Sequence, residues 1–210
     1  MYVLIEGDEA LLVDANPSME AVEFLEQAGV KKATVILTHE HYDHTAGVNR
    51  LRQICDCNVV CTEICARYIQ DPRKNLSQYC SAQYVMLDEP VRGQALALLQ
   101  PFSCTADTFF SGEMELSFCG HKLRITETPG HSKASLCAVL DNTIVFTGDS
   151  LVPHTAVVTR LPGGSRTDYL AHVLPYLQSL PENIWVLPGH FAGVWLKDVM
   201  KEVNEYVAQG

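Results

Sequence analysis

The sequence predicts an α/β protein in which helices cover two β-sheets. Short apolar, β-branched runs recur along the chain, and several of them fall in pairs joined by turn residues, as in β-hairpins. Segments with apolar residues at helical spacing lie towards both ends of the chain. Because we find no internal linker, low-complexity tract or short-period repeat, we predict a single domain over residues 1–210.

In the first part of the chain, predicted strands alternate with predicted helices. The strands cover residues 1–5, 11–14, 33–38 and 57–61. A helix follows Ser18 as its N-cap and ends at Gly29. A second helix is predicted over residues 47–54, and a third begins at Thr62 as its N-cap and runs to about residue 70.

The second part of the chain turns to paired strands. Residues 73–106 show little periodicity, and we expect them either to flank a pocket or to form a packed surface excursion. Further strands are predicted over residues 114–118, 122–128, 136–140, 143–147 and 184–187. Helices are predicted over residues 168–180, with a kink or an end at Pro175, and over residues 195–207.

A dense cluster of metal-binding residue types follows the strand at residues 33–38. His39, His41, Asp43 and His44 lie within six positions. His39 and His41 are two apart in an extended segment, so their side chains point to the same side and can bind one ion together. Asp43 and His44 come after the chain has turned, so we expect them to point elsewhere and to serve a second ion.

Three later strands each end in a glycine followed by a histidine or an aspartate. These residues are His131, Asp149 and His190. A glycine at that position allows a sharp turn that places the next side chain over the edge of the sheet. In α/β proteins this edge, at the carboxyl ends of the strands, is where ligands usually bind. The strand ends therefore predict a metal centre at one edge of the fold.

The composition limits the classes of function. The formal net charge is −10 and no dense Lys/Arg run occurs, which gives no support to nucleic-acid binding. No apolar run has the length of a membrane span, and no secretory signal opens the chain, so we expect neither membrane insertion nor export.

Cysteine usage points to a location. The chain has eight cysteines, which in the absence of a signal leads us to expect a reducing cytoplasm. Cys55, Cys57, Cys61 and Cys65 lie close together, but their spacing matches no standard zinc pair, and we expect buried free thiols there.

The order of these motifs resembles the metallo-β-lactamase superfamily. The chain carries His-x-His-x-Asp-His, then Thr-Pro-Gly-His-Ser, Phe-Thr-Gly-Asp-Ser and a late Pro-Gly-His. The wording is most similar to the glyoxalase II-like hydrolase branch, and the resemblance implies a four-layer αβ/βα sandwich. Glyoxalase II also has a helical glutathione-binding region after this core, whereas here 20 residues follow His190.

The resemblance also implies the ligands of two divalent metal ions, with zinc first and iron or manganese as alternatives. One ion is held by His39, His41 and His131, a second by Asp43, His44 and His190, and both by Asp149. Asp43 and Asp149 are the implied catalytic carboxylates. β-Lactamases usually have cysteine at the bridging position, so Asp149 argues against antibiotic hydrolysis. Flavo-diiron reductases have glutamate where His41 stands, so that branch is also disfavoured.

We therefore expect a hydrolase acting on an ester-like bond of a small molecule, a thioester or a related group, through a hydroxide shared by the two ions. Three alternatives stay open: an iron-dependent persulfide dioxygenase, a phosphodiesterase or lactonase, and a metal-binding accessory protein without activity. The candidate substrate-binding residue is His154, five positions after Asp149. Weaker candidates are Lys133, Arg160, Arg166 and Tyr169, while His121 and His172 are predicted to be structural or solvent-facing.

Overall fold

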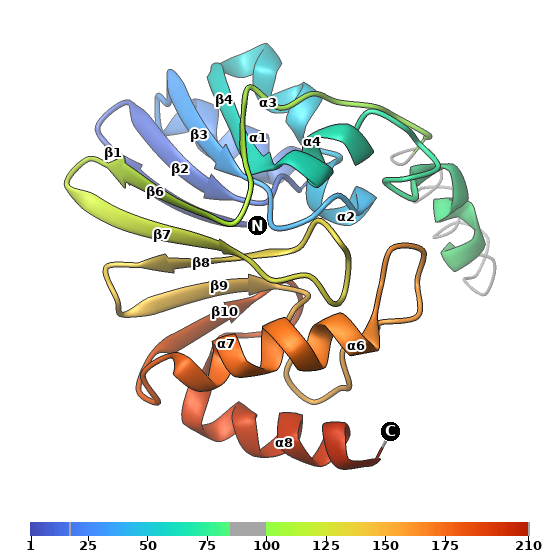
Figure 1. Cartoon of the computed structure of the whole chain (residues 1–210). Helices are drawn as coiled ribbons and strands as arrows, with labels where there is room; N and C mark the ends of the chain where they lie inside the picture. Colours follow the sequence, from blue (N-terminus) through green and yellow to red (C-terminus); the bar gives the residue numbers. More distant parts are fainter. Residues whose placement is uncertain (17, 85–99, 210) are drawn as a thin grey trace. The chain divides into compact units, whose positions relative to one another are not determined.

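The computed structural model describes residues 1–16, 18–84 and 100–209. The chain forms two compact units, Met1–Phe109 (unit 1) and Phe110–Gly210 (unit 2) (Figure 1). Unit 1 contains most of a five-stranded sheet, and unit 2 a six-stranded one. Among the described residues, no helix has both the length and the apolar character needed to cross a bilayer.

Unit 1 is built on a sheet of strand order β1-β2-β3-β4-β5. Its strands are β1 (Tyr2–Glu6), β2 (Glu9–Val13), β3 (Lys32–Ile36), β4 (Asp56–Thr62) and β5 (Thr108–Phe110). β1 and β2 form the predicted antiparallel hairpin, whereas β2, β3 and β4 run parallel. Parallel strands need crossover connections, and the predicted helices supply them.

The described part of unit 1 has five helices, and two of them begin at the capping residues predicted from the sequence, Ser18 and Thr62. The five are α1 (Met19–Gln27), α2 (Tyr42–Thr45), α3 (Val48–Ile54), α4 (Glu63–Tyr68) and the 3₁₀ helix η1 (Ser77–Tyr84). The Ser18 and Thr62 hydroxyls accept hydrogen bonds from backbone N–H groups of the first turns of α1 and α4, both at 3.1 Å. Gly29, at φ 72°, follows the end of α1. Of the irregular segment predicted over residues 73–106, the part at 85–99 lies outside the described residues.

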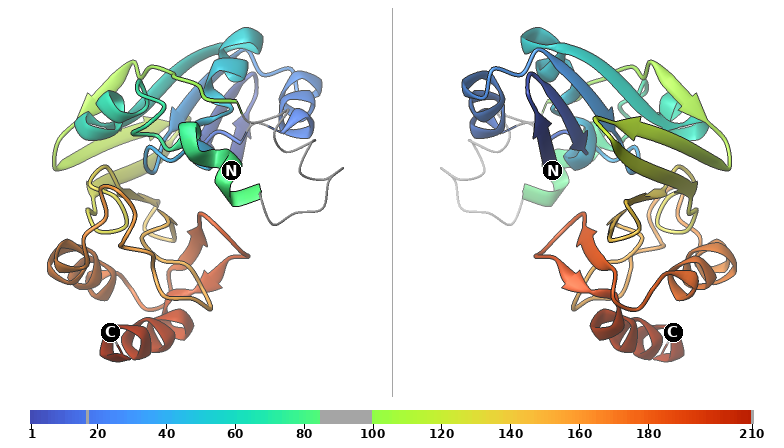
Figure 2. Two further views of the ribbon diagram at one scale, coloured as in Figure 1. Left: turned by 90° about the vertical axis from the view of Figure 1, so that its right-hand side faces the viewer. Right: turned by 90° about the vertical axis from the view of Figure 1, so that its left-hand side faces the viewer.

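Unit 2 is built on a sheet of strand order β11-β10-β9-β8-β7-β6. Its strands are β6 (Glu113–Phe118), β7 (His121–Glu127), β8 (Leu136–Leu140), β9 (Ile144–Gly148), β10 (Trp185–Pro188) and β11 (Val194–Trp195). Both predicted hairpins are confirmed: Cys119 and Gly120 turn one, Asp141 and Asn142 the other, and all four residues have positive φ. The short strand β11, which leads into the last helix in Figure 2, was not predicted.

Two helical segments pack on the sheet of unit 2. The first runs through α6 (Arg166–Asp168), the π-helical turn η2 (Tyr169–Val173) and α7 (Leu174–Ser179), and the second is α8 (Leu196–Gln209). The helix does not end at Pro175, one of the two predicted outcomes, because α7 continues to Ser179. Proline has no N–H to donate to the carbonyl four residues earlier, and the helix absorbs this loss by widening into the π turn.

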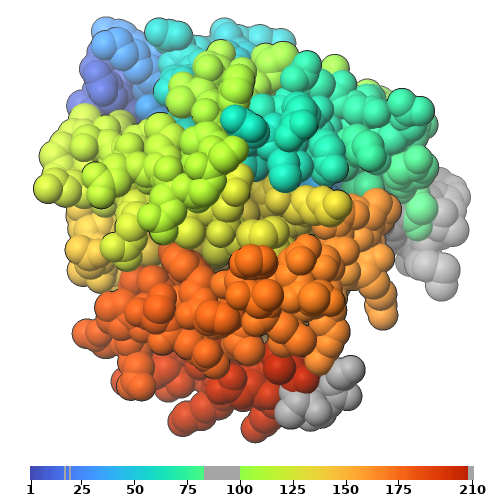
Figure 3. All heavy atoms as spheres, in the orientation of Figure 1, coloured from blue at the N-terminus to red at the C-terminus, as the bar shows by residue number. Residues whose placement is uncertain are grey.

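The core of unit 2 explains how its helices are held. Val173 and Leu177 from the first segment and Val199 and Val203 from α8 are buried together with residues of β8, β9 and β10. The first segment (orange) and α8 (red) lie side by side in Figures 1 and 3. Burial of these apolar side chains holds β10 in place within the sheet.

Candidate metal centre

The site residues of unit 1 follow β3 and lie on and around the one-turn helix α2. His39, His41 and His44 are almost completely buried, whereas the Asp43 carboxylate is partly exposed to solvent. The Nε2 atom of His39 and the Nδ1 atom of His41 are 3.1 Å apart, which confirms that the two side chains point to the same side. We call these four residues the unit 1 set.

The sequence predicts that His44 points away from His39, but the two rings lie close together. The two ring centroids are 4.1 Å apart. The chain turns through α2 at this point, and His44 lies on this single helical turn. The Nε2 atom of His44 also lies 3.7 Å from Asp43 Oδ2. The unit 1 set is therefore one cluster of imidazoles with a carboxylate at its rim.

Asp14, at the end of β2, orients this cluster and was not singled out from the sequence. Its Oδ2 atom accepts a hydrogen bond from His44 Nδ1 at 2.7 Å, and its Oδ1 atom accepts from the Thr38 N–H at 2.8 Å. Because a carboxylate only accepts, the proton of His44 sits on Nδ1 and the Nε2 lone pair stays available for a metal. The only signal in the sequence was an acidic residue at a strand end.

A close backbone contact fixes the loop of the unit 1 set against Asp14. The residue after Asp14, Ala15, donates its N–H to the His44 carbonyl at 2.7 Å and accepts from the Gly47 N–H at 2.8 Å. A Cβ atom at Gly47 would lie 2.8 Å from the Ala15 oxygen, so only glycine fits here without a shift. The sequence thereby holds the start of α3, and the histidines before it, in one position.

The site residues of unit 2 come from the ends of three strands. His131 follows β7, Asp149 follows β9 and His190 follows β10. Asp149 Oδ2 lies 3.5 Å from His131 Nε2 and 3.5 Å from His190 Nε2, so one carboxylate oxygen faces both imidazoles. We call these three residues the unit 2 set.

The glycines before these residues act in different ways. Gly148 has φ 48°, so it provides the sharp turn that the sequence analysis expected before Asp149. Gly130 is needed for packing instead, because a Cβ there would lie 2.9 Å from Tyr169 Cα. Gly189 donates its N–H to the Gly148 carbonyl at 2.8 Å and so ties the end of β10 to the end of β9.

His131 is oriented by a backbone group that sequence reasoning missed. Its Nδ1 atom lies 2.8 Å from the carbonyl oxygen of Val158, in the loop after β9. Since a carbonyl only accepts, Nδ1 carries the proton and Nε2 faces Asp149 with its lone pair. Metal-bound histidines commonly show this arrangement, in which the second ring nitrogen donates to a carbonyl or carboxylate.

The remaining candidates of the sequence analysis have other surroundings. His154 is exposed and hydrogen-bonds to Glu202 of α8 through its N–H at 2.8 Å. Tyr169 lies in the core, where burial raises its pKa to about 12, and Arg166 donates to the Val207 carbonyl. Lys133 and Arg160 are exposed.

His121 and His172 are placed as predicted, and of the four clustered thiols Cys57, Cys61 and Cys65 are buried as predicted, whereas Cys55 is partly exposed. His121 bonds to Asp141 beside the hairpin turn, and His172 is exposed on the π turn. All eight cysteines are free, and within the described ranges no group of three metal-binding side chains includes a cysteine.

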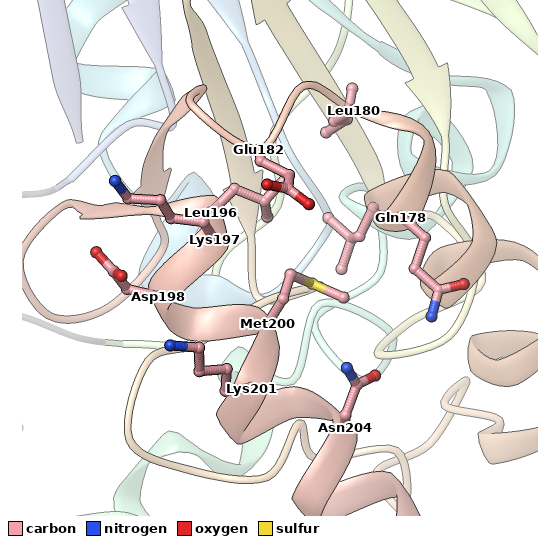
Figure 4. A pocket seen from close by; sticks show the side chains of 10 residues that line it. Gln178, Leu180, Glu182, Leu196, Lys197, Asp198, Met200, Lys201 and Asn204 are labelled. Atoms are coloured by element: carbon pink, nitrogen blue, oxygen red, sulfur yellow. The ribbon is translucent and has the colours of Figure 1, made fainter.

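Unit 2 also has a hollow that the two sets do not line. It measures about 450 Å³ and lies between the end of α7 and the start of α8 (Figure 4). Its lining includes charged side chains, Glu182, Lys197, Asp198 and Lys201, together with leucines, and the Met200 side chain points to the side of Gln178. It is a separate feature of the surface.

Most of the chain matches a known protein family. The family model described as "Metallo-beta-lactamase superfamily" matches residues 1–190. This chain belongs to the metallo-β-lactamase superfamily. The predicted fold class is thereby confirmed.

Individual superfamily members agree with this. "Probable metallo-hydrolase YqgX" of Bacillus subtilis (strain 168) is 27% identical over 192 residues, covering 90% of this chain and 83% of the relative. "Hydroxyacylglutathione hydrolase" of Albidiferax ferrireducens is also 27% identical, covering 90% of this chain and 61% of the relative. The crystal structure of BLEG-1 B3 metallo-beta-lactamase superposes with a TM-score of 0.81 at 24% identity, covering 98% of this chain and 92% of that one. The last comparison shows the fold.

Proposed function

We propose that this protein is a hydrolase that uses two divalent metal ions to cleave an ester-like bond, with thioesters as the first substrate class to test. The observation that carries the proposal is the arrangement of ring nitrogens within each unit. The second nitrogens of His44 and His131 are held by Asp14 and by the Val158 carbonyl, respectively. Side chains held in this way keep one lone pair each for a ligand, at a cost in stability that function explains.

The donor atoms fit metal ions in chemistry and in spacing. Two ligands on a tetrahedral zinc ion, each about 2.0–2.1 Å from it, are about 3.3 Å apart. The donor pairs within the units are separated by 3.1 Å for His39 and His41 and by 3.5 Å for Asp149 and each of its histidines. A mixed imidazole and carboxylate set suits zinc, iron or manganese, and we propose zinc first.

We propose the ligand assignment that the family resemblance implies. In it, His39, His41 and His131 would hold one ion, Asp43, His44 and His190 would hold the other, and Asp149 would serve both. When bound, such ions lower the pKa of water towards neutrality and polarise a carbonyl oxygen.

The protein's own groups then have separate tasks. Asp149, which is largely buried, presents one oxygen to two imidazoles and keeps them apart at a fixed distance. Asp43 has a carboxylate that is 40% exposed, so it is placed to accept the proton that the attacking water loses. In thioester hydrolysis, water adds to the carbonyl carbon, the C–S bond breaks, and the products are a carboxylate and a thiol.

The choice of a thioester rests on similarity. A relative at 27% identity is named as a hydroxyacylglutathione hydrolase, whose substrate is a thioester. A small-molecule substrate and a cytoplasmic location stay predictions, as does a single domain. The alternative chemistry of persulfide oxidation differs in its metal, so it can be separated by experiment.

The first experiment is elemental analysis of protein purified without added metal, followed by assays on a thioester, a lactone, a phosphodiester, a cephalosporin and a persulfide. About two zinc ions per chain with thioester turnover supports the proposal. About one iron ion per chain with oxygen uptake on the persulfide would replace it with the dioxygenase. Bound metal with no turnover on any substrate would favour an accessory protein.

Two histidine variants make a matched test of the ligand assignment. His190 and His172 are both exposed histidines of unit 2, but only His190 faces Asp149. We expect His190→Gln to lose about one metal ion per chain and nearly all turnover, while His172→Gln keeps both. Asp149→Ala should lose both ions. Full metal content in Asp149→Ala would refute the assignment.

A further inference from the structure

Phe191, the residue after His190, and His154 both adopt a backbone conformation that is uncommon for L-residues. Phe191 has φ 68° and His154 has φ 64°. Left-handed backbone costs roughly 1–2 kcal/mol in a residue with a Cβ, and a phenylalanine there is an outlier, whereas histidine occurs there more often. The two residues come from different loops of unit 2, yet their rings lie edge to face with centroids 6.5 Å apart. The fold thus places two strained aromatic residues against each other.

Both loops are held rigidly, so the pair is a fixed feature. Glu202 of α8 accepts the His154 N–H at 2.8 Å, and its other carboxylate oxygen lies 3.3 Å from His154 Nδ1. The Phe191 loop is short, since it joins β10 to β11. It is packed at Gly193, where a Cβ would lie 2.7 Å from Trp185 Nε1. Trp185 in turn packs edge to face against Trp195 of β11.

The pair contributes little to the core. Phe191 is 66% exposed, the largest exposed fraction among the large hydrophobic side chains of the described residues. The His154 side chain is 70% exposed. Glycine or asparagine at either position would relieve the strain with little loss of buried area. Strain retained at an exposed position next to a candidate metal ligand indicates a binding role.

We propose that Phe191, braced by His154 and Glu202, determines substrate specificity by contacting an apolar group next to the bond that is cleaved. This inference rests on the proposed hydrolase function and names its substrate class: esters or thioesters that carry an aryl or alkyl group. An exposed phenyl ring offers apolar area and an aromatic face. The Glu202 carboxylate lies 3.3 Å from His154 Nδ1, so the pair has an acidic neighbour and we expect it to favour a neutral apolar group over an anionic one.

The test compares substrates that differ only in this group. Acetyl and phenylacetyl thioesters of one small neutral thiol form the acyl pair, and S-methyl and S-benzyl thioacetates form the leaving-group pair. The variants are Phe191→Asn, which tolerates left-handed backbone but removes the ring, and Phe191→Tyr, which keeps the ring. Phe24→Asn is the matched control, because it removes a phenylalanine that is 55% exposed on α1 of unit 1.

We expect Phe191→Asn to lower kcat/KM about tenfold or more on the phenyl-bearing member of at least one pair, with less than a twofold change on the small member. Phe191→Tyr and Phe24→Asn should stay within about threefold of the wild type. An equal loss on all substrates would overturn the inference, because Phe191 would then serve only to position His190.

A binding measurement separates this inference from the hydrolase proposal. Calorimetry on the metal-loaded wild type should show tighter binding of phenylacetate than of acetate, and Phe191→Asn should remove the preference. If no ester is turned over but the preference and its loss are seen, the hydrolase proposal fails and the apolar subsite stands. If thioesters are cleaved without any preference between the members of either pair, the subsite fails and the hydrolase proposal stands.

Discussion

Replacing Asp14 by asparagine should change the chemistry of His44 while leaving the fold nearly intact. Asparagine keeps an oxygen that can accept from the Thr38 N–H, now at 2.8 Å from Asp14 Oδ1. Its NH₂ group would take the place of the oxygen that faces His44 Nδ1 at 2.7 Å. An NH₂ group only donates, so His44 must place its proton on Nε2, the atom proposed to bind metal. The substitution inverts the tautomer that the metal needs.

The size of the effect follows from the contacts. Loss of the outer partner of a metal-binding histidine typically weakens metal binding about 10–100-fold. For the fold, Asp14→Asn should cost only about 1 kcal/mol, since asparagine also tolerates the φ of 61° found here. Asp14→Ala leaves the buried Thr38 and His44 N–H groups without an acceptor and puts alanine at that φ. We therefore expect alanine to cost about 3 kcal/mol or more.

Two measurements distinguish these effects. Metal affinity is measured by competition with a chromophoric chelator, and stability by urea denaturation of the metal-free protein. Asp14→Asn should lose affinity at one of two sites with little change in the urea midpoint, and Asp14→Ala should lose both affinity and stability. If Asp14→Asn binds two ions as tightly as the wild type, then Asp14 does not set the tautomer of His44 and the reasoning is wrong.

Three further predictions concern unit 1. Burial alone would raise the pKa of Asp107, but hydrogen bonds from Arg52 and a backbone N–H lower it by more, so the net shift is downward. A depressed pKa gives stability that is present above the unfolded-state pKa and is lost as pH falls through the folded-state value, so Asp107→Asn should lower Tm at pH 7 and much less at pH 3; equal losses at both pH values would contradict this. Gly47→Ala should destabilise unit 1 by about 1–3 kcal/mol in urea denaturation, because its Cβ meets backbone oxygens; an unchanged midpoint would show that this contact relaxes freely. The Sγ atoms of Cys55 and Cys57 are 3.4 Å apart, and this contact lowers the pKa of the Cys55 thiol and raises that of Cys57. Iodoacetamide should therefore label Cys55 first in a mass-spectrometric time course, and equal labelling of the two would contradict this.

The order of elements and the ends of the strands could be predicted because both are local properties of the chain. The hairpin turn at Asp141 and Asn142 and the caps at Ser18 and Thr62 depend on residues within a few positions of each other. The donors themselves were predictable for the same reason, since each follows a recognisable strand. Strands β5 and β11 escaped prediction because two or three residues carry too little pattern to identify a strand.

The groups that orient the donors could not be predicted, because they are distant in sequence. Asp14 is 30 residues from His44, and Val158 is 27 residues from His131. Val158 contributes a backbone carbonyl, so no side-chain pattern could reveal it. The pairing of Phe191 with His154 likewise depends on where two loops end, and the sequence gives no sign of a positive φ at either residue.

These orienting groups differ in a way that has consequences for evolution and for design. A carboxylate such as that of Asp14 can be removed by one substitution, so a single amino-acid change can make the Nε2 lone pair of His44 unavailable to a metal. The Val158 carbonyl is present whatever residue stands there, so the orientation of His131 depends on the path of the loop after β9 instead. That path is fixed in part by the hydrogen bond from His154 to Glu202 of α8. Changes in α8 should therefore reach His131 through the loop, whereas the unit 1 set should respond to substitution of Asp14 itself.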